Sequence, residues 1–380
     1  MSNKVYDVVI VGGGMAGISA AYRIAPHRSV LILEQESQPA YHTTGRSAAM
    51  YMETYGTEQI RALTRASRNF FDNAVNSSFS DTPLLTPRGC IYVAAHDETK
   101  QMHALYDELR SNSPDNVQLI DKDEVMRLVP VMRPERVAGA IYEEHAEDID
   151  VNTLLLSFLS GARKHGAEFH PSSTLASAER IDGVWHIHTS QGDTIQAYTL
   201  VNAAGAWVDV VAERCGVAPI GFVPCRRSAF TFDAPSDLDI KDWVLVVGIM
   251  ENYYFKPDAG QLLGSPSNAD PTEAHDVVAE ELDIASGIYH IEENTILKIH
   301  RPNHTWAGLR TFAPDKDLVI GEDPTAEGFF WLAGQGGYGI QSAPGVSELV
   351  GCLLLDEPLT EDLTKEGVNP EVISPARFRK

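Results

Sequence analysis

Three glycines near the start of the chain have the spacing of a phosphate-binding turn. Gly12, Gly14 and Gly17 form the pattern G-x-G-x-x-G directly after an apolar run at residues 5–11. Such glycines permit a tight turn, let a pyrophosphate approach the backbone and allow a helix to pack closely on a strand. Glu34 follows 22 residues after Gly12, where a carboxylate can accept hydrogen bonds from ribose hydroxyls. The pattern therefore predicts a dinucleotide site.

The elements that would position this motif can be read on either side of it. Residues 5–11 and 30–34 are apolar and rich in β-branched side chains, which favours strands buried on both faces of a parallel sheet. Residues 18–24 predict the helix between them. The start of that helix would direct unpaired N–H groups and positive partial charge at the phosphates. The motif alone does not separate FAD from NAD.

Three later segments favour FAD. Residues 43–49 form a loop of small side chains directly after the second strand, and residues 200–207 read as a buried strand that runs into small residues. Residues 334–341 are a glycine-rich turn before a helical run that ends near residue 355. A turn that opens a helix can direct N–H groups at a reduced, anionic flavin ring. An NAD-binding half-domain would not need segments from both ends of the chain.

These segments also carry a resemblance that covers nearly all of the chain. It resembles the D-amino-acid-oxidase-like flavoproteins, which include glycine and sarcosine oxidases, and within them it is most similar to the bacterial D-arginine dehydrogenases. The similar stretches are YHTTGRSAA at 41–49, PLL at 83–85, RRSAF at 226–230, GSP at 264–266, HTWAGLR at 304–310 and QGGYGIQ at 335–341. The resemblance implies noncovalent FAD and oxidation of an amino-acid α-carbon.

The implied fold is α/β with two domains: a Rossmann-like FAD-binding domain of the glutathione-reductase type and an inserted antiparallel-sheet substrate domain. The expected FAD-binding domain comprises residues 1–80, 145–220 and 305–380, and the substrate domain residues 81–144 and 221–304. Short β-rich runs separated by turns at residues 221–264 agree with an antiparallel sheet. Helical spacing predicts helices at 57–75 and 151–163, the second capped by Asp148 or Asp150.

The resemblance also implies a cofactor site drawn from distant parts of the chain. Its members are Gly12, Gly14, Ala16, Gly17, Glu34, Gln35, Thr43, Thr44, Gly45, Arg46, Ser47, Ala48, Ala49, Met50, Leu175, Ala204, Gly205, Gly336, Gly337, Tyr338, Gly339, Ile340 and Gln341.

A carboxylate clamp is implied for the substrate. Arg227 and Arg310 would bind the substrate carboxylate, since a planar guanidinium holds a carboxylate by two parallel hydrogen bonds. The hydroxyls of Tyr55 and Tyr254 would assist, and the carbonyl of Gly337 would accept a hydrogen bond from the substrate amine. The expected reaction is hydride transfer from the α-carbon to flavin N5. The imino acid formed would hydrolyse to a 2-oxo acid and ammonia. The neighbouring Arg226 is expected to face solvent or a structural carboxylate.

The side-chain pocket departs from the D-arginine dehydrogenase pattern. Cys90 stands where that group has an acidic residue for the substrate guanidinium, Met50 replaces a histidine, and Met52 lies two residues further on. Because Cys and Met form an apolar, deformable surface, an unpaired cationic side chain would be costly to bury there. The sequence therefore predicts neutral or apolar D-amino acids as substrates, with D-Arg and D-Lys poor. Glu53 lies close enough in sequence to supply the missing charge from another direction.

Composition excludes several classes of function. There are 53 Asp+Glu against 30 Lys+Arg, a formal net charge of −23, which disfavours nucleic-acid binding. No stretch approaches the roughly 20 apolar residues of a membrane span. The four cysteines form no C-x-x-C pair, which agrees with the cytoplasm, and peripheral membrane association is expected only if a quinone accepts the electrons. His186 and His188 lack further ligands at workable spacing, so no metal is expected. The serine-hydrolase turn and the P-loop are also absent from the sequence.

Three other functions remain open from the sequence. A flavoenzyme for secondary amines, such as N-methyl or opine-type amino acids, would keep the arginine clamp. A flavin-bearing subunit of a larger dehydrogenase complex would keep the cofactor site, and an NAD-dependent dehydrogenase is the weakest alternative. The electron acceptor (quinone, electron carrier or oxygen) and the oligomeric state are not encoded in any of these motifs.

Overall fold

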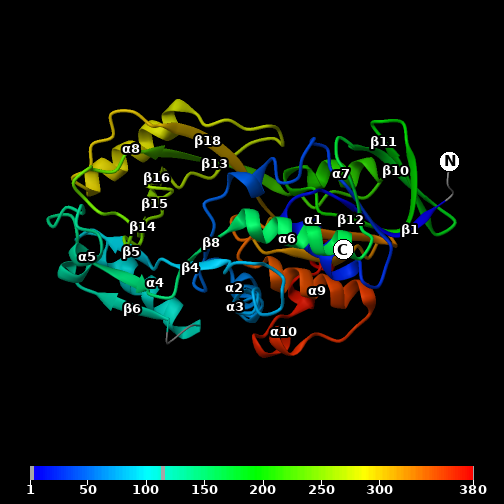
Figure 1. Cartoon of the computed structure of the whole chain (residues 1–380), viewed down its shortest axis with the longest axis horizontal. Coiled ribbons are helices and arrows are strands. Elements are labelled where there is room, and N and C mark those ends of the chain that lie inside the picture. The colour runs from blue at the N-terminus through cyan, green and yellow to red at the C-terminus, as the bar shows by residue number, and fades with distance from the viewer. Residues whose placement is uncertain (1–3, 113–115, 380) are drawn as a thin grey trace.

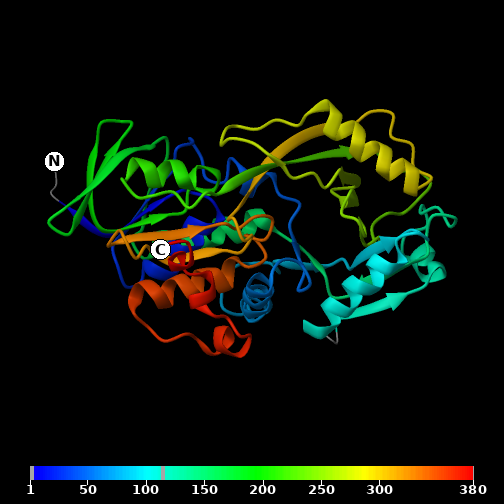
Figure 2. The ribbon, with the colours of Figure 1, turned by 180° about the vertical axis from the view of Figure 1, so that it is seen from behind.

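The computed structural model describes residues 4–112 and 116–379 and divides into two parts, each built on its own large sheet (Figure 1). The chain passes between them several times, and the view from behind shows the same two lobes joined by long strands (Figure 2). Residues 1–3, 113–115 and 380 lie outside the described part; no predicted site residue is among them.

The predicted strand–helix–strand unit is confirmed at the centre of the first sheet. β1 (Val5–Val11) pairs in parallel with β2 (Val30–Leu33) and with β12 (Thr194–Asn202). All four residues of β2 are buried, because helices cover both faces of this sheet and each face needs apolar side chains. α1 (Met15–Ile24) begins directly after Gly14, at the carboxyl end of β1. This arrangement brings the glycine motif to one edge of a parallel sheet.

The rest of the first part completes this sheet and covers it. β12 also pairs in parallel with β20 and antiparallel with β11, while β2 pairs in parallel with β9. α1 packs against α6 and α9 on one face, and α7 contributes to the apolar cluster on the other. The bounds are β9 (Glu168–His170), β10 (Leu175–Ile181), β11 (Val184–Thr189), β19 (Val319–Glu322), β20 (Phe329–Ala333), α6 (Val151–Lys164), α7 (Val208–Arg214), α9 (Ala343–Leu355), α10 (Glu361–Lys365) and α11 (Pro370–Ile373).

Two helix predictions have different outcomes. The helix predicted at 57–75 is two helices, α2 (Glu58–Ala66) and α3 (Arg68–Asp72), separated at Ser67. The Ser67 hydroxyl donates to the Leu63 carbonyl at 2.8 Å and accepts from the backbone N–H of Gly345 at 2.9 Å, which ties the break to α9. α6 begins where predicted, and Asp150 caps it by accepting from the N–H of Thr153 at 2.9 Å.

The second sheet has nine strands in the order β17-β13-β16-β15-β14-β5-β7-β6, with β18 paired to β13. The prediction of an antiparallel sheet needs one correction: β14 and β5 are parallel. They come from segments far apart in the chain, so no hairpin constrains their relative direction. The strands are β5 (Cys90–Ala94), β6 (Val117–Ile120), β7 (Gly139–Glu143), β13 (Val223–Phe232), β14 (Leu245–Gly248), β15 (Tyr254–Asp258), β16 (Gln261–Ser265), β17 (Asp270–Pro271) and β18 (His304–Phe312).

The two faces of the second sheet have different coverings. α5 (Lys122–Leu128) and α8 (Glu281–Asn294) share one apolar cluster with residues such as Ile91 and Phe230. The other face carries α4 (Thr99–Asn112) and a smaller cluster that includes Cys90. Because neighbouring residues on a strand point to opposite faces, β5 contributes to both clusters. The second, smaller cluster faces the first part of the molecule.

A small sheet and a long ribbon connect the two parts. β8 (Glu147–Ile149) pairs with β3 (Met50–Tyr51) and β4 (Leu85–Pro87). On β8, Asp148 accepts from Lys256 Nζ at 2.5 Å and from Arg88 Nε at 2.7 Å, which joins this small sheet to β15. The β13–β18 ladder has nine residue pairs, although the predicted boundary assigns most of β18 to the FAD-binding domain. Within the described residues, no helix combines the length and the hydropathy that crossing a membrane requires.

Candidate active site

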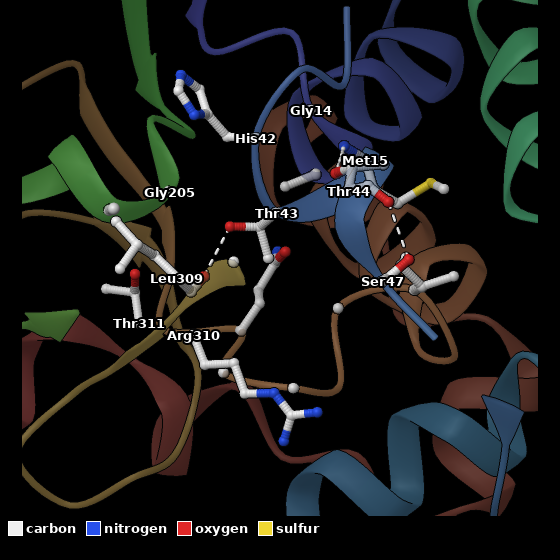
Figure 3. A pocket seen from close by; sticks show the side chains of 18 of the residues that line it. Gly14, Met15, His42, Thr43, Thr44, Ser47, Gly205, Leu309, Arg310 and Thr311 are labelled. Carbon is white, nitrogen blue, oxygen red and sulfur yellow. Dashed lines mark hydrogen bonds between the residues drawn. The ribbon is translucent and has the colours of Figure 1, made fainter. Parts of the chain in front are cut away.

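A large pocket runs from the glycine motif to the second sheet, and most of the predicted cofactor-binding residues line it (Figure 3). The predicted residues on its wall are Gly12, Gly14, Ala16, Glu34, Gln35, Thr43, Thr44, Arg46, Ser47, Ala48, Ala49, Met50, Leu175, Ala204, Gly205, Gly336, Gly337, Gly339, Ile340 and Gln341. Segments from both ends of the chain therefore meet in one cavity.

Two glycines of the motif are packed so tightly that a side chain could not replace their hydrogens. Gly12 has φ +118°, and a Cβ built on it would lie 2.3 Å from the Ala203 carbonyl oxygen. A Cβ on Gly17 would lie 2.0 Å from the carbonyl oxygen of Gly12. Gly14 instead faces the pocket at the start of α1. The backbone at the start of α1 thus borders the pocket with little side chain in the way.

Glu34, which the sequence predicts as a ribose ligand, lies on the pocket wall beside the glycine motif. Its side chain is 7% exposed, lines the pocket, and accepts from the backbone N–H of Gly13 at 2.7 Å and of Glu36 at 2.8 Å. Burial raises its pKa above the ordinary value, although the two N–H donors act in the opposite direction. One of these donors belongs to the glycine turn itself, so the turn helps to fix the carboxylate in place.

The loop after β2 is fastened to the second sheet. The Thr43 hydroxyl donates to the Leu309 carbonyl at 2.6 Å, and Arg46 Nη1 donates to the Ala307 carbonyl at 3.1 Å. Thr44 Oγ1 accepts from the Met15 N–H at 3.1 Å, and Ser47 donates to the Thr44 carbonyl at 2.9 Å (Figure 3). The small-residue loop therefore bridges the start of α1 and strand β18. Arg46 lines the pocket, but its hydrogen bonds go to the protein itself.

Two arginines mark the other end of the pocket. In the β13–β18 ladder Arg227 pairs with Gly308 and Cys225 pairs with Arg310, so the two arginines are diagonal neighbours on one face of the ribbon. Arg310 Nη1 donates to the Tyr55 hydroxyl at 2.9 Å, and Arg227 Nε donates to the Asn268 carbonyl at 2.5 Å. Burial and the positive charge of Arg310 lower the pKa of Arg227.

Neither arginine has an ion-pair partner within the described residues, although both line the pocket. By contrast, Arg226 forms ion pairs with Asp283, Glu280 and Asp270, which confirms the prediction that it meets structural carboxylates. Two half-buried guanidinium groups without an ion-pair partner make this end of the pocket a site for an anion.

The remaining clamp residues come from three further segments. Tyr55 follows β3, Tyr254 begins β15 and Gly337 belongs to the turn before α9; all three line the pocket. A Cβ on Gly337 would lie 2.9 Å from the guanidinium carbon of Arg310. The glycine-rich turn therefore passes directly over the arginine, and a larger residue at this position would displace the guanidinium.

Four predicted residues do not lie on the pocket wall. Gly17 and Gly45 face backbone carbonyls instead, and Tyr338 stacks edge-on against Tyr55 with ring centroids 4.7 Å apart. Cys90 is 0% exposed and lies behind the wall, paired with Glu143 across β5 and β7. Met50 and Met52 do line the pocket. The apolar wall is completed by Tyr92, Leu245 and Val247.

Several lining residues were not predicted. They include His42, Tyr92, Trp207, Arg214, Leu245, Val247, Glu251, Lys256 and Thr311. Two sequence signals could have identified some of them. Leu245 and Val247 alternate along β14 and so share the face that lines the pocket, and Lys256 is a charged residue between Phe255 and Pro257 in a buried strand. Glu251 offered no such signal, because it lies in a turn with φ +51°. Glu53, considered for the charge, instead accepts from Tyr51 and Asn116 and is not on the wall.

Two features of the pocket test whether a dinucleotide fits. Thr311 Oγ1 is buried and has no hydrogen-bond partner, although it faces the pocket. Gly205 has φ +56°, and a Cβ built there would meet no atom within 4 Å. An unsatisfied hydroxyl and open space beside a glycine both suit a polar ligand that fills the cavity. Among the described residues, no group of three or more His, Cys, Asp or Glu side chains is placed to hold a metal ion.

Comparisons with known proteins agree with this geometry. Residues 7–353 match the family model DAO, described as FAD dependent oxidoreductase. The chain is 24% identical over 372 residues to the mitochondrial dimethylglycine dehydrogenase of Mus musculus, covering 90% of this chain. It spans 42% of that relative's length.

Solved structures share the fold over almost the entire chain. The L-proline dehydrogenase of P. horikoshii superposes with a TM-score of 0.83 at 19% identity, covering 99% of this chain and 98% of that one. The glycine oxidase of Geobacillus kaustophilus gives 0.81 at 21% identity, covering 96% and 98%. The match of a family model to most of the chain, on a pocket built for a dinucleotide, shows that this protein belongs to the DAO family of FAD-dependent oxidoreductases.

Proposed function

We propose that this protein oxidatively deaminates D-amino acids with neutral or apolar side chains, using noncovalently bound FAD. The observation that carries this proposal is the pair of half-buried arginines, Arg227 and Arg310, which line one end of the cofactor pocket without an ion-pair partner among the described residues. We also propose that the protein is related to the D-arginine dehydrogenases, that its chain divides into FAD-binding and substrate domains, and that it is located in the cytoplasm.

The clamp would bind and orient the carboxylate of the substrate. Arg310 donates a hydrogen bond from one nitrogen to the Tyr55 hydroxyl. Its further N–H groups would bind an incoming carboxylate. Arg227 would bind from the neighbouring strand, and Tyr254 would add a hydroxyl. A fork of fixed direction selects a planar anion and sets the orientation of the adjacent carbon atom.

The Gly337 carbonyl would accept a hydrogen bond from the substrate amine. The amine must lose its proton before or as the α-carbon hydride leaves, since only a nitrogen lone pair can form the C=N bond. Positive charge on Arg227 and Arg310 would favour the neutral amine. FAD supplies the acceptor for the hydride and its two electrons. Water then adds to the imino acid and releases a 2-oxo acid and ammonia.

The pocket wall supports the proposed preference for uncharged side chains. Met50, Met52, Leu245 and Val247 present apolar surface. Of the described lining residues, only Glu34 and Glu251 are acidic; Glu34 lies beside the glycine motif. Glu251 is exposed on a turn and acts electrostatically on Arg227, so its charge is already opposed by the clamp.

A substrate panel tests the proposal. The purified yellow protein is given D- and L-amino acids and N-methyl amino acids, with an artificial dye as electron acceptor and, in a second series, oxygen alone. We expect dye reduction with D-leucine or D-methionine and a kcat/KM at least tenfold lower with D-arginine. The highest kcat/KM with D-arginine would overturn the specificity, and turnover of L-amino acids only would overturn the stereochemistry.

Oxidation of secondary amines is a second candidate, favoured by the names of the relatives. Dimethylglycine dehydrogenase and L-proline dehydrogenase are named for N-substituted amino acids. The same carboxylate clamp would serve such substrates. Preferential turnover of sarcosine or proline in the panel would select this function, and turnover only after addition of further protein subunits would select a role as the flavin subunit of a complex.

A further inference from the structure

Glu143 is a buried carboxylate behind the pocket wall that the proposed reaction does not use. It ends β7, is 1% exposed and pairs with Cys90 on β5 and with Val117 on β6. Within the described residues it has no ion-pair partner. A buried carboxylate without a neighbouring cation is costly and depends on hydrogen-bond donors. The two residues that donate to Glu143 therefore show which segment of the chain it holds in place.

Both partners belong to the turn that carries Tyr55. The backbone N–H of Glu53 donates to Glu143 Oε1 at 2.8 Å, and the Thr54 hydroxyl donates to Oε2. Tyr55 is the next residue, and its hydroxyl accepts from Arg310. Two hydrogen bonds to the two residues immediately before Tyr55 therefore restrict where its ring can lie.

The same turn is held from its other side by an amide. Gln341 Nε2 donates to the carbonyls of Met52 at 3.2 Å and Tyr55 at 3.3 Å. Gln341 thus bonds to carbonyl groups of the turn, whereas Glu143 accepts from its N–H and hydroxyl groups. These hydrogen bonds connect the turn to the glycine-rich segment on one side and to β7 on the other. Without Glu143, the connection to β7 would be lost and the connection through Gln341 would remain.

We propose that Glu143 is a positioning residue for the carboxylate clamp: its buried carboxylate fixes the Glu53–Thr54 backbone and so holds the Tyr55 hydroxyl against Arg310. This inference rests on the proposed function, because the clamp itself belongs to that proposal. The ionised form suits the task, since each oxygen accepts from one donor, whereas a protonated carboxyl must donate one hydrogen itself.

The surroundings of Glu143 set the pH at which this attachment changes. Burial raises its pKa to about 7, the Thr54 and Glu53 donors act against this, and the negative charge of Glu53 adds to it. The other titratable groups facing it are Cys90 and Tyr92 on β5, and burial keeps the pKa of both well above the ordinary values. Among the described groups around it, Glu53 is therefore the one whose charge opposes ionisation of Glu143.

Binding of propionate to the FAD-loaded enzyme tests the role without involving an amine. The measurement is the change in the visible flavin absorbance between pH 5.5 and 8.5, together with kcat and KM for the best substrate. In the wild type we expect affinity to rise as pH passes about 7. Glu143→Gln should bind propionate roughly tenfold more weakly at pH 8.5, lack the pH step, and raise KM more than it lowers kcat.

Three matched variants separate positioning from general damage. Thr54→Val should weaken propionate binding while Thr54→Ser, which keeps the hydroxyl, should bind it as the wild type does. Glu53→Gln keeps the backbone N–H and removes the nearby charge, so it should retain the pH step but move it to lower pH. A Glu143→Gln enzyme with wild-type affinity and an unchanged step would overturn this inference.

A further variant distinguishes failure of the proposed function from failure of the role proposed for Glu143. If Arg310→Met binds propionate as well as the wild type, the proposed function is wrong and the inference falls with it. If Arg310→Met loses propionate while Glu143→Gln and Thr54→Val bind it normally, only the role of Glu143 is wrong.

Discussion

The two ends of the pocket are built in opposite ways. The cofactor end depends on backbone: Gly12, Gly14 and Gly17 lie within six residues and are positioned by one strand and one helix. The proposed substrate end depends on side chains from distant segments, because Tyr55 and Arg310 are 255 positions apart and yet share a hydrogen bond. The first kind of site is specified locally, whereas the second exists only once the whole chain has folded.

This contrast predicts the largest effect at the cofactor end. Gly17→Leu should abolish FAD binding, because a Cβ at this position would lie 2.0 Å from the Gly12 carbonyl oxygen and must displace the turn. The flavin absorbance near 450 nm relative to protein absorbance measures the loss. Gly216→Ala serves as a control, since no atom lies within 4 Å of its Cβ position, although its positive φ also makes it strained. Full FAD content in Gly17→Leu would show that the turn does not bind the phosphates.

The next largest effect should distinguish the two ends of the pocket, because turnover should fall while the flavin stays bound. Arg310→Met and Arg227→Met should each lower kcat/KM by roughly a thousandfold, since loss of a charge that is buried against a charged ligand costs about 2–5 kcal/mol. Both variants should keep their flavin, because neither side chain belongs to the glycine motif. Arg226→Met is the matched control on the same strand and should retain turnover. If Arg310→Met and Arg227→Met both turned over at wild-type rates, the clamp would be in the wrong place.

A third prediction concerns stability at the substrate end. The pKa of Glu143 is about 7 in the folded protein against an ordinary 4.5, so the folded state binds this proton more tightly than the unfolded state does. Its contribution to stability is fully present below pH 4.5 and is lost as pH rises through 7, a change of about 3 kcal/mol. Glu143→Gln should therefore lose less unfolding free energy between pH 5 and pH 8 than the wild type, as measured by urea denaturation. Equal losses in both proteins would contradict the raised pKa.

The smallest effect is expected at a single hydroxyl. Tyr55→Phe removes the acceptor of the Arg310 hydrogen bond but keeps the ring that stacks against Tyr338. A hydrogen bond to a charged group contributes about 1.5–3 kcal/mol, so kcat/KM should fall roughly tenfold or more, mainly through KM. Steady-state kinetics with the best D-amino acid checks this. A change in kcat alone would place the hydroxyl at the amine rather than the carboxylate.

The same contrast explains what the sequence could predict. The strand, turn and helix around Gly12 follow from local spacing, and the structure has them at residues 5–11 and 15–24. The parallel β5–β14 pair could not be predicted, because it joins segments about 150 residues apart with no turn between them. Cys90 was expected at the pocket surface. It lies on the same face of β5 as Tyr92, which lines the cavity, but Cys90 itself is fully buried beneath that wall, and strand periodicity does not reveal such a difference in depth.

Glu251 shows a different limit of prediction from sequence patterns. Its carboxylate reaches the pocket wall only because a tight turn with φ +51° follows β14, with its N–H donating to the Gly248 carbonyl at 2.8 Å. Such a conformation is uncommon for a residue other than glycine, and nothing in the flanking residues marks it. Side chains on turns are oriented by dihedral angles rather than by periodicity, so pattern reading does not find them.

The ribbon of β13 and β18 also limits how a substrate can enter. The ladder of nine residue pairs includes the arginine pair and reaches the part of β13 that packs against α8. The Thr43 hydroxyl is hydrogen-bonded to the Leu309 backbone on the same ribbon. A hinge that swung the two lobes apart would have to bend this continuous ladder and break its cross-links. Entry and departure are therefore expected through displacement of short surface turns, such as the one bearing Glu251, while the two lobes move as a single rigid frame.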